Sequence, residues 1–197
     1  MSDDQTINVY DAQIDSYTDL VDQKEPDTHL LNFISRIAPD GLVLDLGCGP
    51  AADSSIMRDR GLRVDPVDAS AEMVRHANET YAINARQATF ADINEEQHYD
   101  GIWASFSLLH ASADELPGLL AALHRALKPA GVFHVAMKTG TGARRDKLGR
   151  YYSYYSEQQL RQYLTDAGFT IDATVHGEAM GLAGDVEPWI MLTSVRA

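Results

Sequence analysis

The chain has 197 residues, of which 45% are hydrophobic and 23% are charged, a composition typical of one folded globular domain. Its 29 acidic and 16 basic residues give a formal net charge of −13, which disfavours binding of nucleic acid or anionic lipid through a general positive field. The lone cysteine, Cys48, excludes an internal disulfide, and the sequence shows neither a signal peptide nor an apolar run long enough to cross a membrane. We therefore expect a cytoplasmic protein without nucleic-acid or membrane partners.

The first 40 residues predict helices with an acidic surface. Residues 1–27 contain eight acidic residues and one lysine. Four apolar or aromatic residues recur there at helical spacing: Tyr10, Ile14, Tyr17 and Val21. This arm is either a solvated cap on the body of the protein or a flap over a pocket. A second helical stripe spans residues 30–37, and we assign residues 1–40 to helices that cover the active site and residues 41–197 to the core of a single domain.

Short apolar runs alternate with helical stripes along most of the chain. Strands are predicted at residues 42–46, 62–67, 85–89, 101–106 and 131–137. Helices are predicted at residues 53–60, 70–82, 112–128 and 156–167. Such alternation predicts parallel βαβ units with helices on both faces of the sheet. Two further strands, at residues 169–176 and 188–195, are joined by a short non-helical segment, which favours an antiparallel pair. The predicted fold is a doubly wound α/β sheet of seven strands, mostly parallel, with the last strand antiparallel.

The strongest signal is a glycine-containing turn between the first of these strands and the helix that follows it. Asp45 lies near the end of the strand, and Gly47 and Gly49 follow within the turn. Glycine adopts positive φ and lets a ligand approach the backbone closely, while the next helix offers free N–H groups. A carboxylate at the carboxyl end of a strand, where open α/β sheets bind ligands, can accept a hydrogen bond from an ammonium group.

Two further acidic residues follow the second and third strands. Asp68 is placed to accept hydrogen bonds from both hydroxyl groups of an adenosine ribose, and Asp92 is placed to accept one from an adenine amino group. Met73, one turn into the next helix, would face the adenine. Together with the glycine turn, these residues predict a site that holds an adenosyl ligand across three neighbouring strand ends.

Residues 41–137 resemble the class I S-adenosylmethionine-dependent methyltransferases. The likeness rests on six motifs: Leu44–Gly49, Val67–Ser70, Phe90–Ile93, Tyr99–Ala104, Leu108–His110 and Leu127–Gly131. In that family the glycine turn contacts the methionine part of the cofactor, the second-strand acid binds the ribose and the third-strand acid binds the adenine. The resemblance implies a Rossmann-like fold and S-adenosylmethionine as the cofactor. It also implies these cofactor-binding residues: Asp45, Gly47, Cys48, Gly49, Asp68, Ala69, Met73, Asp92, Ile93 and Ser105.

The chain departs from the family pattern where Ala51 and Ala130 replace two common glycines. Because alanine is small, we expect cofactor binding to persist. Gly47–Ala52 also fits a dinucleotide-binding fingerprint, with Asp68 at the expected spacing, so a dinucleotide-binding oxidoreductase is an alternative. Against it, Pro50 removes an N–H group from the phosphate-facing turn, and no second domain remains for a hydride acceptor. A protein that binds S-adenosylmethionine without transferring a methyl group is a further alternative.

The acceptor of a methyl group would lie at the carboxyl ends of the central strands. His110, which follows the fourth strand, is the candidate catalytic base; alternatively it only caps or packs the next helix. Residues 138–155 carry five basic residues against one acidic residue, and four of the nine tyrosines. This segment is either a lid whose arginines and tyrosines bind an anionic or aromatic small molecule, or a solvated loop. The predicted substrate-binding residues are Tyr17, Lys138, Arg150 and Tyr154.

The nature of the acceptor is suggested by one further stretch. Residues 149–156 resemble the loop-to-helix segment of family members that act on small molecules. The resemblance therefore implies a methyltransferase with a small-molecule acceptor rather than a protein or RNA acceptor, and it leaves the acceptor atom and the oligomeric state open. The seven histidines show no pair at metal-ligand spacing on one helix, so no metal is predicted.

Overall fold

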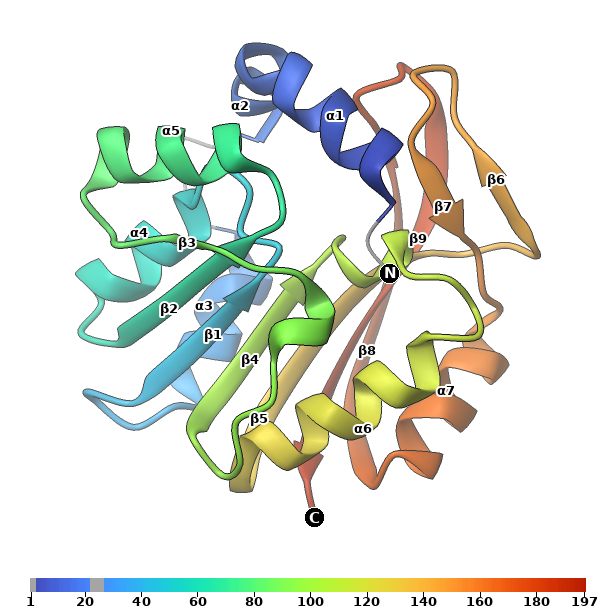
Figure 1. Ribbon diagram of the computed structural model, residues 1–197. Helices are drawn as coiled ribbons and strands as arrows, with labels where there is room; N and C mark the ends of the chain where they lie inside the picture. The colour runs from blue at the N-terminus through green and yellow to red at the C-terminus, as the bar shows by residue number, and fades with distance from the viewer. Residues whose placement is uncertain (1–2, 22–26) are drawn as a thin grey trace.

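The computed structural model describes residues 3–21 and 27–197, whose strands form one seven-stranded sheet and a separate two-stranded ribbon (Figure 1). Across the large sheet the strand order is β3–β2–β1–β4–β5–β9–β8. The strands are β1 (Leu42–Leu46), β2 (Arg63–Asp68), β3 (Arg86–Gln87), β4 (Tyr99–Ser105), β5 (Leu127–Lys138), β6 (Ala143–Arg145), β7 (Tyr151–Ser153), β8 (Phe169–Met180) and β9 (Val186–Arg196). The α-helices are α1 (Asp4–Ala12), α2 (Ile14–Val21), α3 (Thr28–Ser35), α4 (Ala52–Asp59), α5 (Ala71–Tyr81), α6 (Leu116–Ala126) and α7 (Glu157–Asp166).

The strand directions confirm the predicted fold class. Strands β1 to β5 pair in parallel, whereas β9 is antiparallel to both of its neighbours, β5 and β8. The reversed strand is the last one in the chain, as predicted, and it lies inside the sheet with β8 at the edge. This arrangement follows because the short turn at residues 181–185 joins β8 directly to β9.

Helices cover both faces of the large sheet (Figure 1). α6 and α7 pack on one face, where Leu120 and Leu164 join the larger hydrophobic cluster. α3 and α4 pack on the other face, where Phe33 and Met57 cluster with Trp103 of β4. Burial of each such side chain contributes roughly 1.5–3 kcal/mol. Within residues 3–21 and 27–197, no helix combines the length and the apolar character needed to span a membrane.

Local sequence signals set several helix ends. Ser156 and Gln159 form a reciprocal capping box at the start of α7, with the Gln159 N–H donating to Ser156 Oγ at 3.2 Å. Gly168, with φ +99°, follows the end of this helix. α6 begins at Leu116, later than predicted, because Pro117 is suited to the first turn of a helix.

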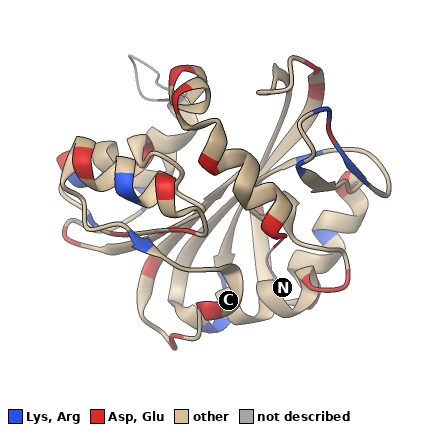
Figure 2. Ribbon diagram, turned by 45° about the horizontal axis from the view of Figure 1, so that its top comes forward, with Lys and Arg blue, Asp and Glu red and all other residues tan. Residues whose placement is uncertain are grey.

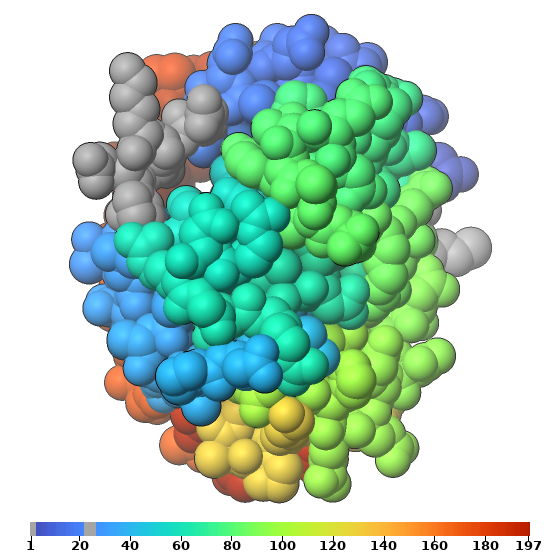
Figure 3. Space-filling view, turned by 90° about the vertical axis from the view of Figure 1, so that its left-hand side faces the viewer, coloured from blue at the N-terminus to red at the C-terminus, as the bar shows by residue number. Residues whose placement is uncertain are grey.

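The N-terminal arm forms two short helices instead of one. α1 and α2 lie across the carboxyl ends of the strands (Figure 1), and in the space-filling view they form the top of the molecule, above α5 (Figure 3). α3 takes no part in this cover, because its apolar residues Leu30, Phe33 and Ile34 are buried against the sheet. Of residues 1–40, the helices that cover the strand ends are therefore α1 and α2.

The basic segment, residues 138–155, is an ordered hairpin rather than the predicted loop. β6 and β7 pair antiparallel within it. Asp146 Oδ1 accepts the N–H groups of Leu148 and Arg150, each at 3.0 Å, and Gly149 has φ +93°. A carboxylate that holds its own downstream backbone, next to a glycine in the left-handed region, makes a tight turn, so the chain reverses here and pairs with itself.

Candidate functional site

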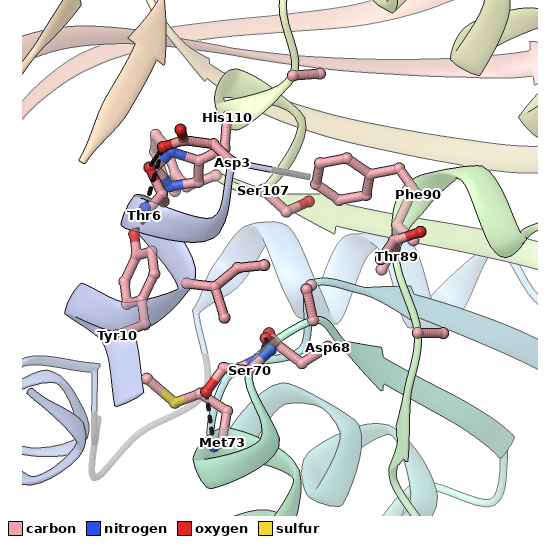
Figure 4. Close-up of a pocket in the computed structure, with 18 of the residues that line it drawn as sticks. Asp3, Thr6, Tyr10, Asp68, Ser70, Met73, Thr89, Phe90, Ser107 and His110 are labelled. Atoms are coloured by element: carbon pink, nitrogen blue, oxygen red, sulfur yellow. Dashed lines mark hydrogen bonds between the residues drawn. The ribbon is translucent and has the colours of Figure 1, made fainter. Parts of the chain in front are cut away.

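A cavity of about 380 Å³, here called the first cavity, lies at the carboxyl ends of β1, β2 and β4 (Figure 4). The glycine turn and the end of β2 form one side of it, and α1 forms the opposite side. Its lining includes Thr6, Ile7, Tyr10, Tyr17, Gly47, Gly49, Asp68, Ala69, Ser70, Met73, Thr89, Phe90, Ser107 and His110. The predicted strand-end site is thus a cavity of a size suited to a small ligand.

The glycine turn leaves no room for side chains. Gly47 and Gly49 have φ of +75° and +54°. A Cβ on Gly47 would lie 2.4 Å from Ser107 Cβ, so only glycine fits there. Ala51 also has a positive φ, +65°, so the alanine in place of the family's common glycine adopts the left-handed region at a steric cost of roughly 1–2 kcal/mol.

A buried carboxyl group, that of Asp45, and a half-buried one, that of Asp53, flank this turn, and neither forms an ion pair with a cation among the described residues. Asp45 is 3% exposed and accepts a hydrogen bond from Ser54 Oγ at 2.6 Å, and Asp53 accepts one from Trp103 Nε1 at 2.9 Å. Burial, helped by the charge of Asp53, raises the pKa of Asp45 to about 8, and burial raises the pKa of Asp53 as well. A cationic group would relieve both shifts, so the pair fits the ammonium group of an amino-acid ligand.

Asp68, at the end of β2, lines the first cavity. Its Oδ1 accepts the Ser70 N–H at 2.8 Å, and its Oδ2 accepts the Gly49 N–H at 2.9 Å. Burial raises the pKa of Asp68. Each carboxylate oxygen can accept a further hydrogen bond, so the side chain is fixed in place and can still bind two hydroxyl groups of a ribose.

The structure separates the residues predicted for the adenine end. Asp92 lies outside the lining of the first cavity, and its Oδ2 accepts the N–H and the Oγ1–H of Thr89, at 2.8 and 2.7 Å. Ile93 also lies outside the lining and is 2% exposed in the core. The side chains of Thr89 and Phe90 line the cavity in their place. Ser107, which the sequence did not indicate, lines it with a buried Oγ that has no hydrogen-bond partner among the described residues.

A second cavity of about 560 Å³ adjoins the first. Four residues line both cavities: Tyr10, Tyr17, Gly47 and Phe106. Among the other predicted site residues, Asp45, Cys48, Ser105, Lys138 and Arg150 line the second cavity. Tyr154 does not line it, and its hydroxyl group donates to Glu187 Oε1 at 2.8 Å. Tyr152, from the tyrosine-rich segment, also lines the second cavity, together with Glu187 and Trp189 of β9, which no sequence motif marked.

A buried hydrogen-bond network connects the walls of the two cavities. Tyr10 Oη lies 2.9 Å from His110 Nε2 and accepts a hydrogen bond from Arg150 Nη1 at 3.1 Å. His110 Nδ1 lies 2.6 Å from the Tyr151 carbonyl oxygen, which can only accept, so Nδ1 carries the proton and Nε2 accepts from Tyr10. Burial lowers the pKa of His110 to about 4, so the imidazole is neutral. Arg150 also donates twice to Asp146 Oδ2, at 2.9 and 2.7 Å.

The cations of the basic segment are paired within the protein. Lys138 and Arg144 bind Glu187, Arg145 binds Asp3, Lys147 binds Asp185 and Arg150 binds Asp146. Figure 2 shows the basic hairpin beside acidic residues of neighbouring elements. Four of these five cations pair with carboxylates on distant parts of the chain, and binding of an anionic or aromatic ligand by this segment stays a prediction.

Hydrogen bonds at both ends of α1 hold this helix over the first cavity. Asp3 accepts two hydrogen bonds from Arg145, each at 2.8 Å, and Thr6 Oγ1 accepts the Tyr151 N–H at 2.8 Å. At the other end of the helix, Asp11 Oδ1 accepts a hydrogen bond from Ser70 Oγ at 2.5 Å. The acidic arm therefore uses its charges and polar groups to cover the cavity, which supports the interpretation as a flap over a pocket.

The sheet order, the glycine turn and the strand-end carboxylates define a Rossmann-like domain with a site for an adenosyl ligand. Comparison with known proteins agrees: residues 43–131 match the family described as "Methyltransferase domain". A curated relative, the cypemycin N-terminal methyltransferase of Streptomyces sp, is 31% identical over 132 residues, which are 63% of this chain and 54% of the relative. The matched part of this chain spans between 36% and 54% of the length of the curated relatives.

Solved structures with a similar fold extend over nearly the whole chain. The Haloferax volcanii complex of the Trm112 methyltransferase activator with a methyltransferase has a TM-score of 0.76, at 17% identity and 97% coverage of each chain. The 1,6-didemethyltoxoflavin-N1-methyltransferase of Burkholderia thailandensis has a TM-score of 0.68 at 22% identity, covering 96% of this chain and 88% of that one. Residues 43–131 therefore match a methyltransferase domain, and the chain has the fold of the similar S-adenosylmethionine-dependent methyltransferase structures, in agreement with the sequence resemblance.

Proposed function

We propose that the protein transfers a methyl group from S-adenosylmethionine, bound in the first cavity, to a small-molecule acceptor in the second. The observation that carries this proposal is the wall shared by the two cavities, formed by Tyr10, Tyr17, Gly47 and Phe106. A space of about 560 Å³ suits a small molecule. The similar Burkholderia thailandensis structure holds 1,6-didemethyltoxoflavin and S-adenosylhomocysteine, which supports both parts of the proposal.

Residues of the first cavity and of its border with the second fit the parts of this cofactor. Asp68, in the first cavity, would hold the ribose hydroxyl groups, and Asp45, which lines the second cavity beside Asp53, would hold the ammonium group. Ser107 Oγ, buried and without a partner among the described residues, offers one further hydrogen bond. The cofactor supplies a methyl group activated on a sulfonium, while the protein supplies position and a dry site.

His110 would take up the acceptor's proton through Tyr10. A nucleophile that is protonated at neutral pH loses a proton when it is methylated, and His110 itself does not line the second cavity. Tyr10 lines both cavities, so its Oη can take that proton while passing its own to His110 Nε2, 2.9 Å away. Methyl transfer would remove the positive charge of the bound cofactor, and the loss of a nearby positive charge favours a proton on the imidazole of His110.

Replacing Tyr10 tests this proton path. Tyr10→Phe keeps the ring but removes the hydroxyl group, so turnover should fall about 100-fold or more, while the affinity for S-adenosylmethionine stays within about twofold of the original. Steady-state formation of S-adenosylhomocysteine and calorimetric binding measure the two quantities. Full turnover in this variant would remove Tyr10 and His110 from the proton path.

The function itself is tested with methyl-labelled S-adenosylmethionine and an extract of small metabolites. We expect S-adenosylhomocysteine to form and the label to appear in a small molecule. Asp68→Ala serves as a control that should lose both signals, because it lacks the proposed ribose ligand. Cofactor binding without methyl transfer to any metabolite would favour the alternative of a non-methylating binding protein, and absence of binding would refute both.

A further inference from the structure

The walls of the second cavity are strongly aromatic. Six aromatic side chains line it, from separate parts of the chain: Tyr10, Tyr17, Trp103, Phe106, Tyr152 and Trp189. Phe106 and Trp189 meet edge to face, with ring centroids 6.4 Å apart and planes at 84°. Flat, rigid walls of this kind bind planar rings through stacked and edge-to-face contacts, each worth about 0.5–1.5 kcal/mol beyond the burial of area.

The lysine and the arginine in these walls have little capacity left for a ligand. Lys138 forms an ion pair with Glu187 and lies over the Tyr152 ring, 4.0 Å from its centroid. Arg150 directs Nε and Nη2 to Asp146 and Nη1 to Tyr10, and its side chain is 3% exposed. An anionic ligand would lose its hydration here without gaining an unpaired cation among the described residues, and burial of an unpaired charge is costly.

The opposite wall disfavours an anion for a second reason. Asp45 and Asp53 line the second cavity, so this wall presents two carboxyl groups to a ligand and supplies no lysine or arginine among the described residues. An acceptor that attacks through an amine nitrogen must be uncharged at that atom, because a protonated amine has no lone pair with which to attack a methyl group. An uncharged acceptor avoids both penalties.

We propose that the methyl acceptor is an uncharged aromatic or heteroaromatic molecule, whose ring lies between the aromatic walls of the second cavity. This inference rests on the proposed methyltransferase function and specifies the substrate class of the same site. Lys138 and Arg150 then hold the walls together through Glu187 and Asp146, and neither acts as an anion-binding group.

Two probes of equal ring size test the inference: 2-naphthylmethanol, which is uncharged, and 2-naphthoate, which is anionic. Each is titrated calorimetrically into the protein with and without S-adenosylhomocysteine. We expect the alcohol to bind at least about tenfold more tightly than the carboxylate. Equal or tighter binding of 2-naphthoate would overturn the inference, and so would failure of both probes to bind. A failure of S-adenosylhomocysteine to bind would instead refute the proposed function, and the two failures are therefore distinguishable.

A substitution that frees Lys138 provides the complementary test. Glu187→Gln removes the carboxylate partner of Lys138, so the affinity for 2-naphthoate should rise about tenfold while that for 2-naphthylmethanol stays within about twofold. Glu178→Gln is the matched control, because it removes the same charge from an exposed residue of β8, the edge strand that pairs with β9. It should alter neither affinity. If 2-naphthoate gains nothing in Glu187→Gln, charge compensation by Glu187 does not set the preference, and the inference fails.

Discussion

The first and second cavities share part of a wall, but the chain builds them in different ways. In the first cavity, the defining contacts join turns that directly follow paired strands, such as the bond from the Gly49 N–H to Asp68, 19 residues apart. In the second cavity, the defining contacts join distant segments, such as the bond from Arg150 to Tyr10, 140 residues apart. α1 covers both cavities. The strand-end wall of the first cavity is assembled by a local motif, whereas the second cavity depends on the docking of α1 and of two hairpins.

The difference shows which kind of site a sequence pattern can reveal. The carboxyl ends of parallel strands meet at one edge of a sheet, so the acids and glycines that follow them come together whatever the rest of the chain does. No such rule places the basic segment, residues 138–155, beside α1. The contacts of this segment depend on how two separate elements pack. The second cavity should therefore be the more sensitive to the loss of a single buried pair.

Breaking that buried pair is expected to have the largest effect. The side chains of Arg150 and Asp146 are 3% and 9% exposed, so Arg150→Ala leaves a buried carboxylate without its partner. We expect the free energy of unfolding, measured by urea denaturation, to fall by about 3–5 kcal/mol. Arg145→Ala is the matched control: Arg145 is 40% exposed in its pair with Asp3, and its loss should stay below about 1 kcal/mol. Equal losses in the two variants would contradict the contrast.

Most of the fold could be predicted because its signals are periodic. The helix predicted at residues 70–82 is observed as Ala71–Tyr81, and the strand predicted at 101–106 as Tyr99–Ser105. Helical and strand spacings of apolar residues, together with glycines that end helices, carry this information. The hairpin of β6 and β7 was missed, because its turn depends on Asp146 folding back onto the backbone, which composition does not reveal.

The site was predicted unevenly for the same physical reason. Asp45, Gly47 and Asp68 line the cavities as expected, since each follows a strand of the parallel sheet. Glu187 and Trp189 could not be found, because β9 reaches the second cavity only through its antiparallel pairing with β5. The role predicted for Asp92 in binding adenine stays a prediction.

The next largest effect distinguishes Asp68 from Asp92, both of which were predicted to bind the cofactor. Asp68 lines the first cavity and Asp92 does not. Asp68→Ala removes the carboxylate that would accept hydrogen bonds from the ribose hydroxyl groups, so the affinity for S-adenosylmethionine, measured by calorimetry, should fall about 100-fold. Asp92→Ala should reduce it less than about threefold. A comparable loss in Asp92→Ala would mean that the third strand end contacts the cofactor after all.

Binding of the cofactor's ammonium group beside Asp45 should release a proton from the protein. In the free protein the pKa of Asp45 is raised to about 8 by burial and by Asp53, so the carboxyl group is largely protonated at about pH 7. An ammonium group beside it favours the carboxylate and lowers this pKa. The affinity for S-adenosylmethionine should therefore rise as the pH increases toward 8, by up to about tenfold per pH unit. The free energy of unfolding of the free protein should fall over the same pH range. The reason is that the raised pKa of Asp45 makes the folded state bind this proton more tightly than the unfolded state does.

Calorimetry in buffers of different ionisation enthalpy measures this proton release directly. The binding enthalpy of the original protein should depend on the buffer, and Asp45→Asn should remove that part of the dependence. Identical enthalpies for the original protein in all buffers would place the ammonium group away from Asp45.

The smallest effect concerns the two alanines at left-handed positions, which lie in opposite surroundings. Ala51 and Ala130 have φ of +65° and +62°, so glycine at either position relieves roughly 1–2 kcal/mol of steric strain and adds about 0.5–1 kcal/mol of chain entropy to the unfolded state. Ala130 is exposed, and Ala130→Gly should therefore raise the free energy of unfolding by up to about 1 kcal/mol. Ala51 is 0% exposed and packs in a cluster with Ala77. Ala51→Gly also loses about 0.8 kcal/mol from its buried methyl group, so its net effect in the same denaturation experiment should be close to zero. A larger gain at Ala51 than at Ala130 would show that strain in the glycine turn outweighs the packing beside it.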